Sequence, residues 1–394
     1  MPRLRNQARA TAIVVALTAW IGTLAIRASF GGLTLHAAGP EAVFQSPSAA
    51  GDSYRAVVDW LTLPPGRPEA SGLHRYVGNM HGDIAVSSRG DVYVSVQALD
   101  KNNQPLSEED ADPLAGVQVY SADGRYIRNV RNAPSNLHGF VIHKEADGEF
   151  IYAVRLATGP KEAEQAWAGL PEQAIVKLTL DGKVVRSISA AAIPDRFKNK
   201  NPADGRPYLR LTGIAVAPNG DIYVSDGYAS DYIHRFDRTG KYLASFGGGG
   251  EPYNFRTLHK LAIDTRFSPP RLIACDRANN RVVHLSLNGE MLGIVASGLL
   301  LPAAVAIHGD DAAIAELKGR VTLVNKDGLV VARLGTNDVA DEVGTKLIEP
   351  ARWRPGISNA PHGIAFDSDG DLFVSEFSIF GRVLRFDKPS GAAR

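Results

Sequence analysis

The sequence has a single cysteine, Cys275, among its 394 residues, so an intramolecular disulfide is excluded and the fold must be held by its core. It also lacks an excess of charge of one sign: 43 Lys and Arg residues nearly balance 42 Asp and Glu residues, for a net charge of +1. Nucleic-acid binding calls for a strongly basic face, so this balance argues against a nucleic-acid partner. What is present is an apolar content of 44% and 39 glycines, which suits a turn-rich β protein.

Several familiar signatures are missing as well. The chain has no phosphate-binding glycine loop, no Gly-x-Ser-x-Gly elbow and no His-Glu-x-x-His helix. No segment beyond the N-terminal part shows helical periodicity. These absences exclude the common nucleotide-binding, serine-hydrolase and helical zinc-protease sites.

An apolar run of about 17 residues, 10–26, lies near the N-terminus. Its flanking arginines are Arg3, Arg5, Arg9 and Arg27. Basic residues before an apolar run are typical of an export signal, and no small-x-small cleavage site follows closely. We interpret residues 1–30 as a signal peptide or an uncleaved signal-anchor helix, with a buried core helix as the alternative. The three arginines that precede the run would stay cytoplasmic, which predicts a periplasmic or extracellular protein, with a membrane tether if the segment is uncleaved.

A pattern of two apolar alternating segments around a Gly-containing turn recurs beyond residue 53. Its turn and second segment lie at residues 89–95, 147–152, 219–225 and 369–375, and in less regular form at 271–274 and 310–314. A second series of turns lies at 123–125, 181–183, 239–241, 288–290 and 327–329. Glycine supplies the positive φ of a hairpin turn, so each unit is expected to hold four short antiparallel strands.

Tandem four-stranded units predict an all-β fold, a six-bladed β-propeller. A β-sandwich is the competing interpretation, but it would not repeat its turn chemistry six times. The predicted blades begin near residues 81, 138, 212, 259, 303 and 362. The last blade lacks a fourth strand, and the lone strand-like segment Tyr54–Leu63 is expected to supply it and close the ring. Residues 54–394 are therefore assigned to the propeller and 31–53 to a linker.

The long connections are predicted to crowd one face of the propeller, because they fall at equivalent places in the units. They are 97–116, 155–173, 191–211, 247–258 and 336–361. Long loops on a rigid scaffold commonly carry binding sites. This face is the predicted functional face, with tolerated insertion as the alternative.

Three histidines begin the innermost strands of alternate blades on that face, in Leu137-His138-Gly139, Leu258-His259-Lys260 and Pro361-His362-Gly363. In a six-fold ring they would lie about 120° apart, which predicts a metal site with three nitrogen ligands and an open position. Zinc is favoured, and iron, copper or nickel suit imidazole as well. His81 begins the first blade one residue out of register, as a candidate fourth ligand, channel residue or surface residue.

The motif set resembles the peptidyl-α-hydroxyglycine α-amidating lyase family, within the wider group of NHL-repeat propellers. The propeller similarity covers about residues 75–388, and the lyase similarity is densest over 222–285. The motifs that carry it are Tyr223-Val224-Ser225-Asp226-Gly227-Tyr228 and Asp276-Arg277-Ala278-Asn279-Asn280-Arg281. The chain departs from the family pattern at Gly363, where the family has Asp, and at 96–98, where the family has an arginine.

The resemblance implies a metal centre at His138, His259 and His362, a catalytic tyrosine at Tyr228 and an active-site arginine at Arg277. A structural calcium ion is a further cofactor that it allows. For Arg277 the alternative is a structural role between blades. The implied reaction is cleavage of a carbinolamide-like or hemiaminal-like C–N bond, with Tyr228 as base and Arg277 holding a substrate carboxylate or polarising the tyrosine.

Two other function classes remain open from the sequence. If His81 joins the ring, a non-haem iron or copper oxygenase is an alternative enzyme. A non-catalytic propeller that binds a peptide, glycan or envelope partner is the other. We expect a monomer that binds a small-molecule or peptide-like substrate.

Overall fold

The computed structural model describes residues 54–63, 77–97, 115–131, 133, 137–156 and 173–389. The predicted N-terminal helix and linker, 1–53, lie outside the described residues, as do most of the predicted loops 97–116 and 155–173. Within the described ranges, no helix is both long and apolar enough to cross a membrane.

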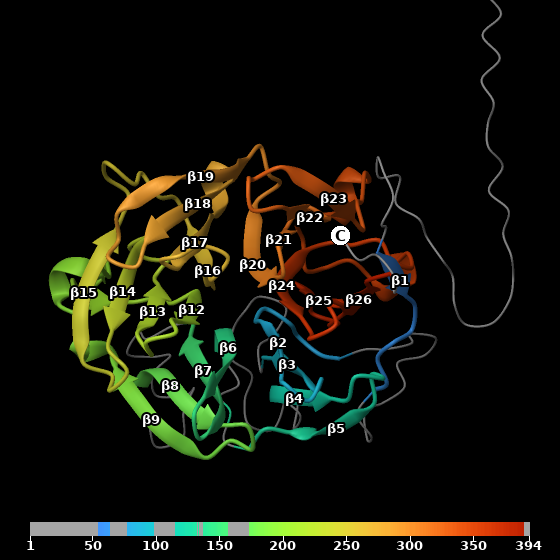
Figure 1. Ribbon diagram of the computed structural model, residues 1–394, viewed down its shortest axis with the longest axis horizontal. Coiled ribbons are helices and arrows are strands. Elements are labelled where there is room, and N and C mark those ends of the chain that lie inside the picture. The colour runs from blue at the N-terminus through green and yellow to red at the C-terminus, as the bar shows by residue number, and fades with distance from the viewer. Residues whose placement is uncertain are drawn as a thin grey trace, which may run out of the picture. The chain divides into compact units, whose positions relative to one another are not determined.

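Six four-stranded antiparallel sheets, the blades, surround a central axis (Figure 1). The first blade contains β2 (Ile84–Val86), β3 (Val92–Val96), β4 (Gly116–Tyr120) and β5 (Tyr126–Asn129). The second contains β6 (Leu137–Glu145), β7 (Gly148–Arg155), β8 (Gln173–Thr179) and β9 (Val184–Ser189). The third contains β12 (Gly213–Val216), β13 (Ile222–Ser225), β14 (Tyr232–Phe236) and β15 (Tyr242–Gly247).

The other blades continue in chain order around the ring. The fourth contains β16 (Leu258–Asp264), β17 (Arg271–Asp276), β18 (Arg281–Ser286) and β19 (Met291–Ser297). The fifth contains β20 (Pro302–His308), β21 (Asp311–Glu316), β22 (Arg320–Val324) and β23 (Val330–Leu334). The sixth contains β24 (Pro361–Phe366), β25 (Leu372–Glu376), β26 (Val383–Asp387) and β1 (Arg55–Val57). The predicted six-bladed propeller is therefore confirmed.

Short strands and single-turn helices lie in the connections between the blade strands. They are the hairpin β10 (Asn199–Lys200) and β11 (Pro207–Tyr208) and the single-turn 3-10 helices η1 (Ala190–Ala192), η2 (Asp195–Phe197), η3 (Arg277–Asn279), η4 (Ala340–Glu342) and η5 (Pro350–Arg352). All but η3 lie in the long connections that the sequence places on one face.

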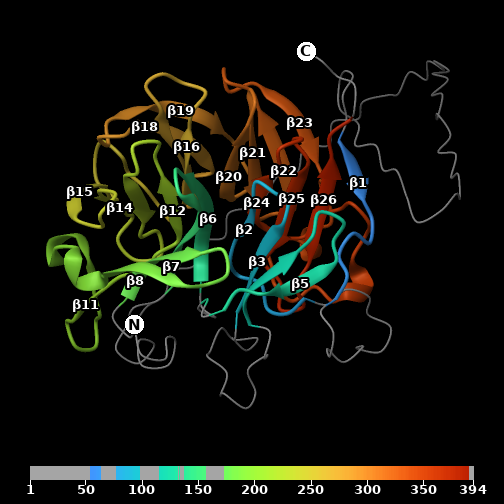
Figure 2. The ribbon, with the colours of Figure 1, turned by 60° about the horizontal axis from the view of Figure 1, so that its bottom comes forward.

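The ring is closed by strands from both ends of the described chain, as the sequence predicts. Strand β1 pairs antiparallel with β26, with Arg55 opposite Asp387 and Val57 opposite Arg385. Figure 2 shows the blue β1 beside the red β26. This pairing covers an edge that would otherwise present unpaired backbone groups.

Apolar packing between neighbouring blades forms the core. Ile214 and Val224 of the third blade, for example, share one buried cluster with Val154 and Ile175 of the second. Every residue of β13 is buried, because an inner strand has a neighbouring blade on each face. The recurring turns use glycine as expected, and Gly220 has φ +88° in the turn between β12 and β13.

Removing β1 is expected to destabilise the propeller. Tyr54 and Ala56 are 8% and 6% exposed, so a chain that starts at residue 59 loses their burial and the β1–β26 pairing. Loss of the tyrosine contact alone should lower the free energy of unfolding by at least about 2 kcal/mol. Urea unfolding of the chain that starts at residue 59, compared with one that starts at residue 54, measures the effect. Equal urea midpoints of the two chains would show that β1 does not close the ring.

Candidate metal centre

The three predicted histidines meet on the propeller axis. His138, His259 and His362 are the second residues of β6, β16 and β24, and each pair of imidazole rings has its centroids 4.9 Å apart. All three side chains are buried. Alternate blades thus place three imidazoles at the corners of an equilateral triangle.

Each of the three Nδ1 atoms is bonded to a backbone carbonyl of the following blade. The pairs are His138 with Thr212 at 2.7 Å, His259 with Ala303 at 2.6 Å and His362 with Gly82 at 2.8 Å. A carbonyl oxygen only accepts, so each Nδ1 carries the hydrogen and each Nε2 keeps its lone pair. Among the described residues, the buried Nε2 atoms of His138 and His362 have no hydrogen-bond partner. A carbonyl that accepts from Nδ1 in this way is the usual support that orients an imidazole toward a metal.

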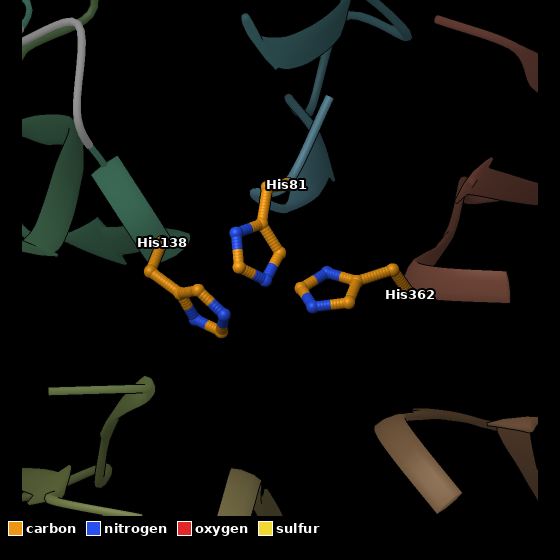
Figure 3. Close-up of side chains that lie close together, drawn as sticks. All are labelled: His81, His138 and His362. Atoms are coloured by element: carbon orange, nitrogen blue, oxygen red, sulfur yellow. The ribbon is translucent and has the colours of Figure 1, made fainter. Parts of the chain in front are cut away.

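His81 joins the ring from the first blade. Figure 3 shows its imidazole pointing toward those of His138 and His362, and its ring centroid lies 5.0 Å from each of theirs. Candidate ligand atoms of these three residues lie within 4.8 Å of one another.

The register offset of His81 has a steric cause. Gly82 provides the carbonyl that His362 needs, and a Cβ at position 82 would lie 2.0 Å from Oγ of Ser95. A side chain therefore does not fit at the ring position of this blade, and the imidazole comes from the residue before it. A role of His81 as fourth ligand stays a prediction.

Burial keeps the four imidazoles neutral. It is the largest cause that lowers the pKa of His138, His259 and His362 well below 6.5, and nearby positive groups act in the same direction. The pKa of His81 falls to about 3, again chiefly through burial and then through Arg277. Neutral imidazole is the form that binds a metal, so this nitrogen set fits a divalent zinc, iron or copper ion.

The metal-free protein should lose stability on acidification through these groups. Below pH 6.5 the unfolded chain binds a proton at His81 that the folded chain does not bind until about pH 3. His81 should therefore make the free energy of unfolding fall by about 1.4 kcal/mol per pH unit as the pH decreases between these values. Urea unfolding of wild type and His81→Asn from pH 7 to 5 tests this, and parallel curves would contradict it.

Tyr228 and Arg277 also lie at the ring. Tyr228 follows β13, and its Oη is 3.0 Å from Nε2 of His259 and 3.4 Å from Nε2 of His81. Arg277 begins η3, and its Nη1 donates to Oη of Tyr228 over 3.1 Å. The structure thus brings together every predicted site residue, with the side chain of Arg277 hydrogen-bonded to the tyrosine.

Asp226 holds the Tyr228 loop in place. One carboxylate oxygen accepts the backbone N–H of Arg210 at 2.6 Å and the other accepts the hydroxyl of Ser230 at 2.5 Å. Burial raises the pKa of Asp226 to about 7. The equivalent acids of the next three blades pair with arginines instead, namely Asp276 with Arg281, Glu316 with Arg320 and Glu376 with Arg382.

The three described long connections contact the loops that carry the site. Asn199 donates to the carbonyl of Ala229 at 3.0 Å, and Asn279 of η3 donates to the carbonyl of Asn254 at 2.8 Å. The backbone of Lys346 in the connection 336–361 accepts the N–H of Ile379 at 3.0 Å. These three loops therefore gather at the histidine face, as predicted.

Sequence reasoning missed three residues around the ring. The ring of Phe377 lies 4.6 Å from that of His81, and Lys260 and Asp83 form an ion pair at 3.1 Å next to the histidines. The glycine at position 363 also has a steric explanation, because a Cβ there would lie 2.7 Å from Oδ1 of Asp83. A side chain at position 363 would therefore clash with Asp83 of the neighbouring blade and with Ser375. For two of the missed residues the sequence did offer a signal, which is their closeness to a ring histidine. Lys260 follows His259, and Asp83 lies two residues after His81.

Comparison with known proteins supports the resemblance. The chain is 26% identical over 204 residues to a probable peptidyl-α-hydroxyglycine α-amidating lyase of Caenorhabditis elegans, covering 49% of this chain and 52% of the relative. It is 33% identical over 209 residues to peptidyl-α-hydroxyglycine α-amidating lyase 1 of Drosophila melanogaster, covering 48% and 36%. The matched part thus spans about a third to a half of these relatives. No family model matches the chain.

Solved structures support the fold. A gluconolactonase from Xanthomonas campestris superposes with a TM-score of 0.52 at 11% identity, covering 86% of this chain and 90% of the other. A Bacteroides thetaiotaomicron protein of unknown function gives 0.50 at 14% identity, covering 80% and 71%. At such identities the likeness concerns the fold alone.

Proposed function

We propose that this protein is a metal-dependent lyase that cleaves the C–N bond of a carbinolamide or hemiaminal. The observation that carries the proposal is the position of Tyr228, whose Oη lies 3.0 Å from Nε2 of His259 and 3.1 Å from Nη1 of Arg277, at a ring of inward-facing imidazoles. The similarity to proteins named as amidating lyases supports the same chemistry.

His138, His259 and His362 would hold the metal, zinc as first choice and iron or copper as alternatives. A bound divalent metal would supply Lewis acidity to the hydroxyl oxygen of the substrate. The carbonyls of Thr212, Ala303 and Gly82 fix the three imidazoles in the tautomer that such a site needs.

The chain's own residues account for the proton transfer. Tyr228 is the base that takes the proton of the substrate hydroxyl, and the guanidinium of Arg277 donates a hydrogen bond to its oxygen. The electron pair of the broken O–H bond then forms the carbonyl as the C–N bond breaks, and the leaving nitrogen takes the proton from Tyr228. One O–H and one C–N bond break while one C=O and one N–H bond form, so neither water nor an oxidant is consumed.

A small N-acyl-α-hydroxyglycine tests the proposal, since the named relatives act on the peptidyl form of this group. The metal-loaded protein should release the primary amide and glyoxylate in equal amounts without oxygen uptake, and the chelated protein should not. Failure of the loaded, folded protein to release either product would contradict the proposal.

A four-histidine centre is a second candidate, because ligand atoms of His81, His138 and His362 lie within 4.8 Å of one another. Such a centre suits a non-haem iron or copper oxygenase. Elemental analysis of the purified protein together with oxygen uptake distinguishes the two. Bound iron or copper with substrate-dependent oxygen consumption would favour the oxygenase.

We also propose that the protein works outside the cytoplasm, as a monomer, and that residues 1–30 direct its export or hold it at the membrane. The basic and apolar pattern of that segment is the support. Fusing residues 1–53 to an enzyme that is active only after export should give an active fusion, and a fusion that lacks residues 1–30 should be inactive.

A further inference from the structure

A buried ion pair lies next to the histidine ring on the side of the inner strands. Lys260 directly follows His259, and its Nζ is 3.1 Å from Oδ1 of Asp83. The two side chains are 4% and 12% exposed. Burying a charge in this way is costly unless it is paired and hydrogen-bonded.

The surroundings of the ammonium group are those of a cation site. Besides the carboxylate of Asp83, the carbonyl oxygens of Gly82 and His362 each lie 3.3 Å from Nζ of Lys260. A carboxylate with backbone carbonyls is the set of oxygens that a hard cation such as Ca²⁺ takes in proteins. Here the chain's own ammonium occupies that set.

The same oxygens belong to the support of the histidines. The carbonyl of Gly82 accepts from Nζ of Lys260 and also from Nδ1 of His362 at 2.8 Å. Asp83 further accepts the backbone N–H of Ile84 at 3.1 Å. The pair therefore links the inner strands of the first, fourth and sixth blades at the point where His362 is oriented.

An axial cavity of about 280 Å³ approaches the pair from the side of the inner strands. Inner strands of all six blades line it, and its wall includes Asp83 and Lys260 but none of the four histidines. The ion pair thus lies between this cavity and the histidine ring.

We propose that Lys260 is an internal cation that positions the histidine centre, with Asp83 as its counter-ion. Its ammonium group fills an oxygen site on the axis and holds the Gly82 carbonyl where His362 needs it. The inference rests on the proposed function in taking the histidines as metal ligands. Lys260 is a positioning residue and does not itself contact the substrate.

The full-length chain with Lys260→Met tests the positioning role, because methionine fills a similar volume without charge. Removing the ammonium leaves the Asp83 carboxylate to attract a cation, so electrostatics alone predicts tighter Zn²⁺ binding. Loss of positioning predicts binding about 10- to 100-fold weaker, the range seen when support of a metal ligand is lost. Competition with a chelator measures the affinity, with exposed Lys241→Met as the control. Unchanged or tighter binding by a folded Lys260→Met protein would overturn the proposal.

Lys260→Ala tests the cation site itself, since it should open the oxygen set to an added ion. Millimolar Ca²⁺ should raise the melting temperature of this variant and leave that of wild type and Lys260→Met unchanged. An equal response of all three would overturn the proposal. This measurement needs no bound zinc, so it is independent of failure of the proposed lyase function.

Asp83→Asn covers the case in which neither Lys260 variant folds. The substitution keeps the shape and leaves an uncompensated ammonium beside the histidines, so Zn²⁺ binding should weaken at least tenfold. Binding as tight as that of wild type would overturn the proposal.

Discussion

Replacement of Tyr228 by Phe is expected to lower the turnover of an N-acyl-α-hydroxyglycine by about 10²- to 10⁴-fold, the usual contribution of a positioned acid–base group. The hydroxyl that bonds to Nε2 of His259 and Nη1 of Arg277 is the only group removed. Neither the three carbonyl-bonded imidazoles nor their Nδ1 partners change. Metal content and melting temperature should therefore stay close to those of wild type while kcat falls.

Tyr223→Phe is the matched control for this experiment. Tyr223 lies five residues before Tyr228 in the same motif, and its hydroxyl donates to the carbonyl of Leu287 at 3.0 Å, away from the ring. Its loss should cost about 1 kcal/mol of stability and leave kcat unchanged. A Tyr228→Phe protein that keeps metal and turns over within threefold of wild type would exclude Tyr228 as the base.

Replacement of His259 by Ala is expected to abolish stoichiometric metal binding. His259 supplies one corner of the 4.9 Å triangle, and its Nδ1 is fixed by Ala303 at 2.6 Å. Loss of a supporting group already costs 10- to 100-fold in affinity, so loss of a direct ligand should exceed about 100-fold. Elemental mass spectrometry after dialysis should find about one metal ion per wild-type chain and almost none in the variant, since a catalytic site needs its full set of three protein ligands.

A buried histidine away from the ring provides the control. His234 is buried, with Nδ1 bonded to the hydroxyl of Ser245 at 2.8 Å, and His234→Asn should keep its metal. His81→Asn should lose less metal than His259→Ala if the triangle is the ligand set. The opposite order would identify His81, His138 and His362 as the ligands, and wild-type protein without bound metal would refute the centre altogether.

The blades and the positions of the histidines could be predicted because both follow local rules that repeat. A Gly-containing turn between apolar alternating segments specifies a hairpin wherever it occurs, and four regular copies with two less regular ones indicate six blades in a ring. His138, His259 and His362 stand at the same place in alternate copies. Their convergence on one axis then follows from the symmetry of the ring.

The residues that decide where each imidazole lies act through contacts between blades. No local sequence pattern encodes such contacts. His81 lies one residue out of register because Ser95 leaves no room for a side chain at Gly82. Position 363 is a glycine where the family has Asp, and in the structure a side chain there would clash with Asp83 and Ser375. The sequence does not reveal the contact between Gly363 and Asp83, because the two residues are 280 positions apart in the chain and become neighbours only when the first and sixth blades meet.

The sequence by itself therefore determined the six-bladed ring, its closure by the strand near Tyr54, the histidine triangle and the nearby tyrosine and arginine motifs. Only the tertiary structure decided which carbonyl fixes each imidazole, that Oη of Tyr228 contacts both His259 and Arg277, and that Lys260 and Asp83 pair on the axis. The physical reason is that strand periodicity and turn chemistry act over a few residues. Hydrogen bonds and ion pairs between blades instead require backbone positions that are set only when the whole ring has closed.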